Sequence, residues 1–306
     1  MRSTVALKYK DIERLFRVRP NRRVRLQDYK PGWKGEGDRR DLAKEELKAS
    51  TQEYLQKNLD ELADAQERLY ATGRHSLLIV LQAMDAAGKD GIIKHVMSGI
   101  NPQGCEVFSF KRPSDEDLAH NFLWRYSKCL PERGRIGIFN RSHYEEVLVV
   151  RVHREVLDRQ RLPPGKRNRA FWNARYDDIN QLERHLTRNG TVVLKFFLHV
   201  SKGEQKRRLL DRLDHPSKYW KFSVADLAER KLWKEYQDAY EEMLNRTSTK
   251  WAPWWVIPAD NKWMSRSLVA TIVTRTIEDL GLKMPPVGPE QQREVARAKR
   301  QLLAER

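Results

Sequence analysis

After Gly73, short apolar runs alternate with stretches of mixed apolar and polar residues at helical spacing. The apolar runs are residues 77–81, 105–110, 136–139, 192–198 and 254–257. Helices are predicted between them, at about residues 89–98, 115–129, 142–150, 172–188, 203–213, 224–246 and 264–280. Buried strands that alternate with helices are typical of a mainly parallel sheet covered on both faces. The pattern therefore predicts a single α/β domain.

The chain before Gly73 divides into two parts. From Asp41 to about Tyr70, leucines recur at near-helical spacing among charged residues, and Gly73 is expected to end that helix. Residues 1–40 are Arg-rich and interrupted by prolines and glycines, which predicts an irregular basic arm. Residues 283–306 are a second basic segment, expected to be a helical tail. The central domain is therefore predicted to span residues 41–282.

Composition and charge narrow the classes of function. The 306 residues are 40% hydrophobic and include 9 Trp, as expected for a folded globular protein. The net charge is +17, of which residues 1–40 carry +8 and residues 283–306 carry +3, leaving +6 for the central domain. Such an excess indicates a polyanionic partner, namely nucleic acid, an acidic membrane or a phosphate-rich small molecule. Solvated surface charge is the alternative interpretation.

The lack of a targeting signal and the small number of cysteines indicate the cellular compartment. No apolar run approaches the roughly 20 residues needed to cross a bilayer, and residues 1–16 lack the apolar core of a signal peptide. Cys105 and Cys129 are the two cysteines, too few for a disulfide framework or a zinc cluster. These features predict a cytoplasmic protein without a membrane segment.

The sequence LLIVLQAMDAAGKDGIIKHVMSG, residues 77–99, has the layout of a phosphate-binding P-loop, usually written G-x-x-x-x-G-K-[ST]. Ala83 stands in place of the first glycine, and Asp90 replaces the hydroxyl that binds Mg²⁺. Lys89 is expected to be exposed in the site and to add a positive charge. Without the hydroxyl, Asp85 is the predicted metal ligand. The residues expected to surround a phosphate are Ala86, Ala87, Gly88, Asp90 and Gly91.

The sequence RIGIFNRSHYEEVLVVRVH, residues 135–153, brings two more side chains to the same edge of the sheet. In P-loop enzymes this strand usually ends in an acid that serves Mg²⁺, but here Asn140 offers a ligand without charge. Arg141 is expected to bind a phosphate through both terminal nitrogens. His143 is interpreted as a polar residue at the start of a helix rather than as a catalytic group.

Residues 201–230 concentrate cations around a helix break at Pro216. The cations are Arg207, Arg208, Arg212, Lys218 and Lys221. P-loop kinases place a mobile lid after the fourth strand, where it brings cations onto the transferred phosphoryl group. A solvated charged helix is the alternative. No Ser-His-Asp set competes with this arrangement, so the residues predict phosphoryl transfer by a P-loop kinase.

Several long motifs resemble those of the polyphosphate kinase 2 family. They are AMDAAGKDGIIKHVMSGINPQG, FKRPS, IGIFNRSHYEEVLVVRVH, WKFS and TSTKWAPWWVIPADNKW, and the likeness runs from about residue 42 to residue 280. The resemblance implies a three-layer α/β/α sandwich similar to thymidylate kinase, with a helical lid at about residues 201–230. It also implies phosphoryl transfer between inorganic polyphosphate and nucleotides with Mg²⁺ or Mn²⁺, and a homo-oligomer, either a dimer or a tetramer.

The resemblance assigns roles by position. The residues implied to act in catalysis are Asp85, Lys89, Asn140, Arg141, Arg208 and Arg212. Further phosphate contacts are implied for Lys218 and Lys221, and nucleotide contacts for Lys111 and Arg112 of the FKRPS motif. Many family members carry Asp where this chain has Asn140, which leaves metal binding and nucleotide choice open at that position. The overall pattern is most similar to the branch that accepts both nucleoside mono- and diphosphates.

Two alternatives stay open on the sequence. The first is an ATP-dependent nucleotide kinase of the same fold, which would use ATP rather than polyphosphate as the donor. The second is a nucleic-acid-binding protein with an inactive P-loop, although nucleic acid is not the expected partner. It predicts salt-sensitive RNA or DNA binding that survives the loss of Lys89.

Overall fold

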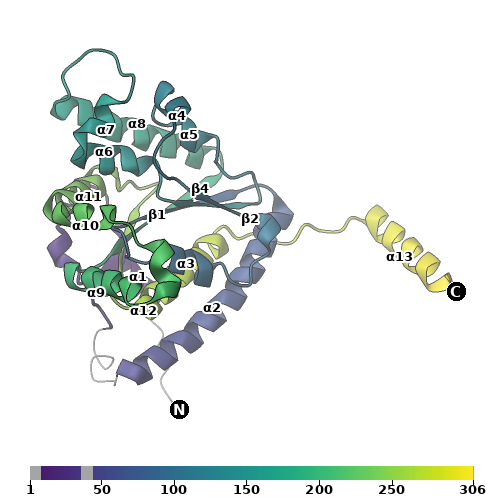
Figure 1. Cartoon of the computed structure of the whole chain (residues 1–306). Coiled ribbons are helices and arrows are strands. Elements are labelled where there is room, and N and C mark those ends of the chain that lie inside the picture. The colour runs from purple at the N-terminus through teal and green to yellow at the C-terminus, as the bar shows by residue number, and fades with distance from the viewer. Residues whose placement is uncertain (1–7, 36–43, 306) are drawn as a thin grey trace.

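A five-stranded sheet forms the centre of the molecule in a computed structural model that describes residues 8–35 and 44–305 (Figure 1). The strands are β1 (Ser76–Gln82), β2 (Cys105–Ser109), β3 (Ile136–Asn140), β4 (Thr191–His199) and β5 (Trp254–Pro258). Their order is β2-β3-β1-β4-β5, and every pairing is parallel. All five strands predicted from the apolar runs are confirmed. The order places β1, which precedes the P-loop, at the centre of the sheet.

Helices cover both faces of the sheet. On one face lie α2 (Lys44–Thr72), α3 (Lys89–Val96) and α12 (Lys262–Glu278), with α12 packed against both of the others. On the other face lie α6 (Val149–Val152), α8 (Arg169–Arg188) and α11 (Trp233–Thr247) (Figure 1). Apolar side chains explain this burial, because all residues of β1 and β5 are buried between the two helical layers. The predicted three-layer α/β/α sandwich is thus confirmed.

Several helices differ in extent from the pattern. The first ends at Thr72, directly before Gly73 as predicted, and Gly73 has a left-handed backbone (φ 57°). The expected start of this helix at Asp41 lies outside the described residues. The helix expected at 115–129 is two short helices, α4 (Asp115–Ala119) and α5 (Trp124–Ser127). The stretch 142–150 begins as a 3₁₀ helix, His143–Val147, and 224–246 divides into α10 (Ala225–Lys231) and α11. A short helix that was not predicted, α7 (Arg154–Asp158), follows α6.

The N-terminal segment differs from the predicted irregular arm. Helix α1 (Tyr9–Phe16) is followed by a backbone hydrogen bond from Val18 to the Trp254 carbonyl (2.8 Å) at the edge strand β5. Ile12, Phe16 and Val18 are each no more than 4% exposed. Arginines stand between these apolar residues in the sequence. The prediction of an irregular arm followed the arginines, whereas the apolar side chains pack into the core. The predicted boundary between residues 40 and 41 lies outside the described residues.

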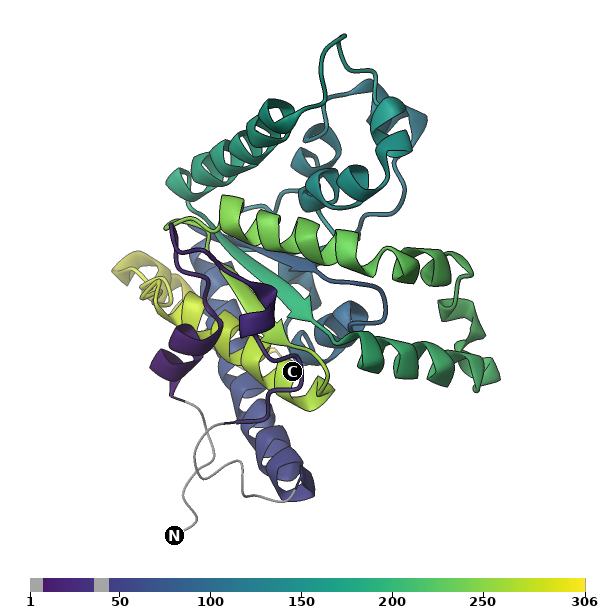
Figure 2. The ribbon, with the colours of Figure 1, turned by 90° about the vertical axis from the view of Figure 1, so that its left-hand side faces the viewer.

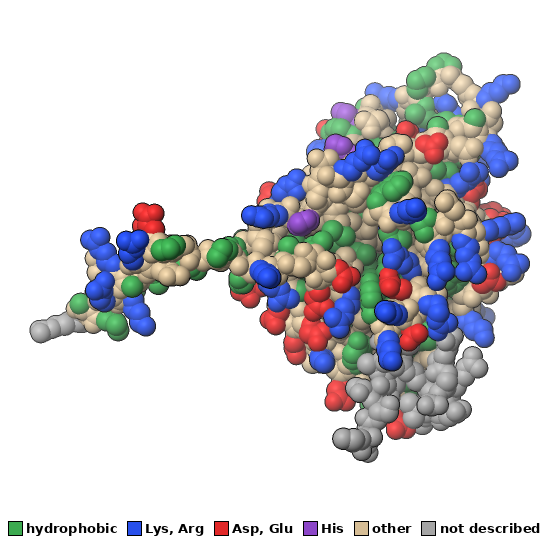
Figure 3. All heavy atoms as spheres, turned by 180° about the vertical axis from the view of Figure 1, so that it is seen from behind, with side chains coloured by type: hydrophobic (Ala, Val, Ile, Leu, Met, Phe, Trp, Pro, Cys, Tyr) green, Lys and Arg blue, Asp and Glu red, His purple; other side chains and the backbone are tan. Residues whose placement is uncertain are grey.

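The C-terminal segment projects from the body. Helix α13 (Pro289–Ala304) has no buried residue and stands away from the sheet layers at the end of an extended stretch (Figure 1). On the face shown in Figure 3, Lys and Arg side chains are spread among acids over the body and along α13. Across the described residues, none of the helices combines the length and apolarity that a membrane span requires.

Candidate active site

The P-loop connects the end of β1 to the start of α3. Gly88 precedes the helix with φ 116°, and Ala86 lies in the left-handed region at φ 61°, a conformation that costs a non-glycine residue about 1 kcal/mol or more. Ala83 does not have a positive φ, so the missing glycine is tolerated there. The loop therefore curls tightly around the N-terminus of α3, the end of a helix that attracts anions.

Lys89 is buried, in contrast to the predicted exposure. Its side chain folds back so that Nζ donates to the Ala83 carbonyl at 3.0 Å, and the residue is only 9% exposed. Burial, together with the charge of Arg141, lowers the pKa of Lys89 to about 8, although Asp85 and Glu145 oppose the shift. The amine thus ties the start of α3 to the end of β1, and Lys89 still lines the basic cavity described below.

Arg141 lies between two carboxylates. Its terminal nitrogens donate to Asp85 (2.5 Å) and to Glu145 (3.0 Å). The charge of Glu145 raises the pKa of the guanidinium, burial opposes that rise and Asp85 supports it. The backbone of Arg141 is left-handed (φ 64°), and its N–H donates to the Leu81 carbonyl, which holds it against β1. A phosphate that is bound by Arg141 must therefore share it with these acids.

Asn140 faces the start of α3. Its amide nitrogen donates to the carboxylate of Asp90 at 2.9 Å. The hydrogen bond joins the end of β3 to the first turn of α3 and directs the amide toward the cavity that both residues line. Asp90 therefore serves as an acceptor for Asn140 at the position where the usual P-loop carries a hydroxyl.

Arg208 fastens α9 (Lys202–Leu213) to the P-loop. It is 5% exposed, and its terminal nitrogens donate to the carbonyls of residues 86 and 87 and of residues 259 and 260, at 2.6–3.1 Å. Nε donates to Glu204 at 2.7 Å. Gln205, also on α9, donates to the Asp85 carbonyl at 3.0 Å. The guanidinium donors of Arg208 are thus directed at protein acceptors, and this part of the predicted lid belongs to the wall of the site.

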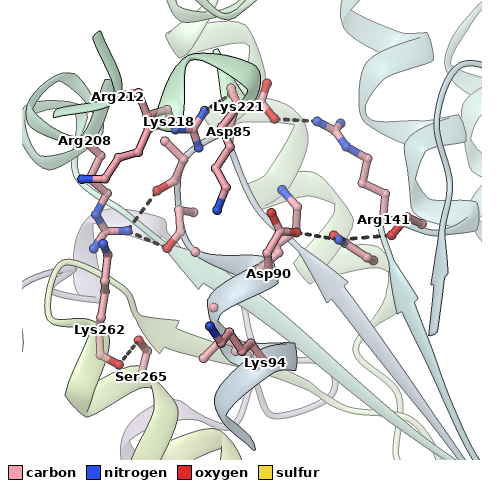
Figure 4. A pocket seen from close by; sticks show the side chains of 18 of the residues that line it. Asp85, Asp90, Lys94, Arg141, Arg208, Arg212, Lys218, Lys221, Lys262 and Ser265 are labelled. Carbon is pink, nitrogen blue, oxygen red and sulfur yellow. Dashed lines mark hydrogen bonds and ion pairs between the residues drawn. The ribbon is translucent and has the colours of Figure 1, made fainter. Parts of the chain in front are cut away.

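Arg212, one turn further along α9, is more accessible. Its side chain is 21% exposed and donates to the Lys221 carbonyl (2.8 Å) and to Asp226 (3.4 Å). Lys218 pairs with Asp211 at 2.8 Å, and Lys221 lies over the ring of Trp220. The break predicted at Pro216 is the 3₁₀ helix Pro216–Lys221, which carries both lysines over the cavity (Figure 4).

A basic cavity of about 850 Å³ joins these groups. Lys and Arg side chains from the P-loop and α3, from the ends of β2 and β3, from the lid and from α12 line it, and the sequence predicted those of the P-loop, the two strand ends and the lid. The cations that it missed are Lys94 on α3 and Lys262 and Arg266 on α12 (Figure 4 labels both lysines). Lys262 and Arg266 follow β5 and lie four residues apart, so the rule that sites form beyond the carboxyl ends of strands was a usable signal.

A second cavity of about 500 Å³ adjoins the first. Both cavities are bordered by Asp85, Phe110, Lys111 and Arg141. The second is more mixed in character, with apolar walls that include Leu118, Val149 and Val156 and with Arg112 at its edge. Lys111 therefore lies where the cavities meet, and Arg112 lies in the second alone. Two ligands bound in these spaces would approach each other at Asp85 and Arg141.

His143 takes no part in either cavity. It is 1% exposed, and its Nε2 lies 3.5 Å from the buried carboxylate of Glu183. Glu183 also accepts a hydrogen bond from Lys195 at 2.6 Å. This ion pair lies within the core between α8 and β4. Its position agrees with the interpretation of His143 as a structural residue.

Four carboxylates line the basic cavity, and two of them are candidate ligands for a cation, because Asp90 accepts from Asn140 and Asp211 pairs with Lys218. Asp85 comes from the P-loop and Asp226 from α10 of the lid, and both line the cavity. Burial, followed by the charge of Asp85, raises the pKa of Asp226, while Arg212 opposes the rise. The described residues contain no group of three or more His, Cys, Asp and Glu side chains arranged around one metal. Such an arrangement suits an ion that takes most of its ligands from substrate phosphates and water.

Known proteins similar to this chain share its whole domain. The family model described as polyphosphate kinase 2 matches residues 45–284. An ADP-polyphosphate phosphotransferase of Rhodopseudomonas palustris is 50% identical over 88% of this chain and 96% of its own length. An AMP/ADP-polyphosphate phosphotransferase of Meiothermus ruber is 45% identical over 88% of this chain and 94% of its own length.

A solved structure agrees with these relatives. The crystal structure of polyphosphate kinase 2 from Arthrobacter aurescens superimposes with a TM-score of 0.80 at 38% identity, and the match covers 91% of this chain and 94% of that one. The family match extends from the second residue of α2 to beyond α12, so it includes every strand, the P-loop and the lid. The chain belongs to the polyphosphate kinase 2 family.

Proposed function

We propose that this chain transfers a phosphoryl group between inorganic polyphosphate and nucleotides. The observation that carries the proposal is the pair of cavities that meet at Asp85 and Arg141. The basic cavity suits a linear chain of phosphates, because cations from several elements and the N–H groups of the P-loop line it. The adjoining mixed cavity suits a nucleotide, with apolar walls for the base and arginines for its phosphates.

The reaction needs alignment and charge neutralisation more than proton transfer. A terminal oxygen of the nucleotide phosphate attacks the end phosphorus of polyphosphate, and the bond to the next bridging oxygen breaks. The shortened polyphosphate leaves with the bonding electrons, so atoms and charge balance. Lys89 and Arg141 stabilise the charge that spreads over the transferred group, and Arg212, Lys218 and Lys221 close over it from the lid.

We propose Mg²⁺, with Mn²⁺ as a substitute, as the cofactor. Asp85 and Asp226 would hold the ion, which would neutralise phosphate charge when bound. Lid closure would then be coupled to metal binding, because Asp226 lies on α10. Asp85→Asn should raise the Mg²⁺ concentration that gives half-maximal activity as well as slow transfer. An unchanged Mg²⁺ titration would show that the ion is held elsewhere.

One assay tests the proposed reaction. Purified protein with Mg²⁺ is supplied with polyphosphate or ATP as the donor and with AMP, ADP, GMP or GDP as the acceptor, and the products are separated. We expect transfer from polyphosphate to both mono- and diphosphates. Transfer from ATP alone would instead identify an ATP-dependent nucleotide kinase. Salt-sensitive RNA binding without any transfer, unchanged in Lys89→Ala, would identify a nucleic-acid-binding protein.

We further propose a homo-oligomer, a dimer or a tetramer, acting in the cytoplasm. Helix α13 supports assembly with a second copy, because Val295, Leu302 and Leu303 are 58–76% exposed, and no residue of this helix is buried. Sedimentation of the full chain and of a chain that ends at Leu282 tests this part. A monomer in both cases would contradict it. The cytoplasmic setting is supported by the two free cysteines.

A further inference from the structure

A groove lined by arginines lies apart from both cavities of the active site. It has a volume of about 980 Å³, and we call it the arginine groove. Its six arginines are Arg23, Arg151, Arg154, Arg167, Arg169 and Arg246. None of its lining residues borders the basic cavity or the mixed cavity. The groove is therefore a separate feature of the surface.

The groove runs between α8 and α11, which lie one above the other in Figure 2. Arg151 and Arg154 reach it from α6 and α7, whereas their neighbours Val150 and His153 line the mixed cavity. Arg23 comes from the N-terminal segment, where the N–H of Val24 donates to Asn245 on α11 at 2.7 Å. Segments distant in the sequence thus bring their arginines to one place.

The six arginines of the groove outnumber its three acids, so the groove carries a net positive charge. Arg23, Arg154, Arg169 and Arg246 are exposed, and in the described part of the chain their side chains form no ion pair and no hydrogen bond. The acids that line the groove are each engaged: Asp238 pairs with Lys234 (2.6 Å), Glu242 with Arg151 (2.5 Å), and Glu241 accepts from the Leu26 N–H (2.9 Å). The groove therefore presents free guanidinium groups to solvent.

Two further features of the groove indicate which kind of anion it would bind. The N-terminus of the 20-residue helix α8 opens into the groove at Asn168 and Arg169, which adds the positive end of a helix dipole to the arginines. The aromatic lining residue Trp172 is 9% exposed and lies beneath Arg151, so it offers no free face on which a nucleic-acid base could stack. Phosphates without bases fit this surface better than RNA does.

We propose that the arginine groove is a second binding site for inorganic polyphosphate, which holds a part of the chain distant from the reacting end. The inference rests on the proposed function, since it concerns the same substrate. Guanidinium groups bind phosphate oxygens in pairs, and several of them along one groove match a chain of repeating phosphates. A chain bound at two places dissociates more slowly, because release of one segment leaves the other attached.

Chain length provides the test. Short donors such as tri- and tetrapolyphosphate fill the basic cavity alone, whereas a long chain can occupy both places. We expect Arg154→Gln with Arg169→Gln to raise the KM for long-chain polyphosphate about tenfold or more and to leave the KM for short donors unchanged. The matched control is Arg297→Gln with Arg300→Gln on α13, which removes the same charge from equally exposed positions. We expect no change in its chain-length dependence.

A binding measurement accompanies the kinetics. The affinity for end-labelled long-chain polyphosphate, followed by fluorescence anisotropy, should fall about tenfold in the groove variant and stay unchanged in the control. The proposal would be overturned if the variant had the same KM as the wild type for each donor length and the same anisotropy. A parallel rise for both donor lengths would also overturn it, since the groove would then act on the active site itself.

Two other outcomes are distinguishable. A loss of RNA affinity in the groove variant with unchanged polyphosphate affinity would assign the groove to RNA and overturn the proposal. A wild type that transfers no phosphate would contradict the proposed function, but the anisotropy measurement does not depend on transfer and still decides whether the groove binds polyphosphate.

Discussion

At the scale of single residues, Lys89 combines burial with a position beside the phosphate site. Its pKa is lowered to about 8, so the free enzyme loses the charge as the pH rises through that value. We expect kcat/KM, which reports on the free enzyme, to fall above about pH 8. The corresponding fall in kcat should occur at higher pH, because bound phosphates stabilise the ammonium. The pH profiles of both parameters check this expectation.

Substitution separates Lys89 from other groups that titrate. Lys89→Ala should lower the transfer rate by about 10²-fold or more and abolish the fall in the kcat/KM profile near pH 8. Lys89→Arg, whose charge persists at high pH, should move that fall upward. A fall near pH 8 that persists in both variants would assign the titration to another group.

Asn140 tests acceptor choice at the same scale. Asn140→Asp would replace the hydrogen bond to Asp90 by two facing carboxylates, which repel each other and the substrate phosphates unless a cation lies between them. We expect the ratio of kcat/KM values for AMP and ADP to shift roughly ten- to hundredfold, as one added charge can produce 1–3 kcal/mol. The AMP/ADP ratio is measured for the wild type and for the variant at saturating Mg²⁺. A ratio that stays within about twofold would show that the subclass is encoded elsewhere.

At the scale of elements, α9 divides the arginines into an anchor and a lid group. Arg208 donates to four carbonyls and to Glu204, so Arg208→Ala should lower the free energy of unfolding by roughly 3–5 kcal/mol and disorder the P-loop. Arg212→Ala should leave stability nearly unchanged and lower kcat on the order of 10²-fold. Denaturant titration and steady-state kinetics of the two variants distinguish these roles. If both variants lost kcat to the same extent and were equally stable, Arg208 would act in the lid, as the sequence predicted.

The contact between α10 and α7 is expected to depend on pH. His153 lies 2.8 Å from Glu229 of α10 and 3.0 Å from Glu155 of α7, and both contacts have an N–H to donate only when the imidazole is protonated. Burial alone would lower the pKa of His153, but the hydrogen bonds and charges of Glu229 and Glu155 raise it overall. The stabilisation is therefore complete below the ordinary value of about 6.5 and is lost as the pH rises through the raised pKa.

His153→Gln measures this contact. The variant should lower the free energy of unfolding at about pH 6 and have little effect on it at about pH 9. The loss at pH 6 should be at most about 1 kcal/mol, because the pair is near the surface. A destabilisation of the same size at both pH values would mean that the protonated ring does not hold the two helices together. Chemical shifts of the His153 ring during a titration provide an independent reading of its pKa.

At the scale of the whole molecule, the N-terminal segment contributes to the stability of the core. Phe16 is 4% exposed and packs edge-on against Trp33 with ring centroids 5.0 Å apart. We expect Phe16→Ala to lower the free energy of unfolding by roughly 3–5 kcal/mol. The control Val287→Ala, at a position that is 47% exposed, should change it by less than about 0.5 kcal/mol. An equally small effect of Phe16→Ala would mean that the segment is dispensable for folding.

The sequence alone determined the strands, the order of elements and the position of the phosphate loop. Five short apolar runs alternate with helices, a pattern that predicts a parallel sheet covered by helices on both faces; the edge strand β2 is the one whose residues all stay partly exposed. The P-loop was readable because its function requires a glycine, a lysine and a helix N-terminus in adjacent positions. Positions directly after two strands were enough to predict four residues that line one cavity, namely Asp85, Lys89, Asn140 and Arg141.

Tertiary structure alone decided what each charge contacts. Arg208 and Arg212 are one helical turn apart and chemically identical, but the first reaches buried carbonyls of two loops and the second reaches the lid. The burial of Lys89, the entry of Phe16 into the core and the assembly of the arginine groove likewise depend on partners distant in the chain. Local spacing specifies which face a side chain occupies, whereas its burial, pKa and available donors depend on what that face meets after folding.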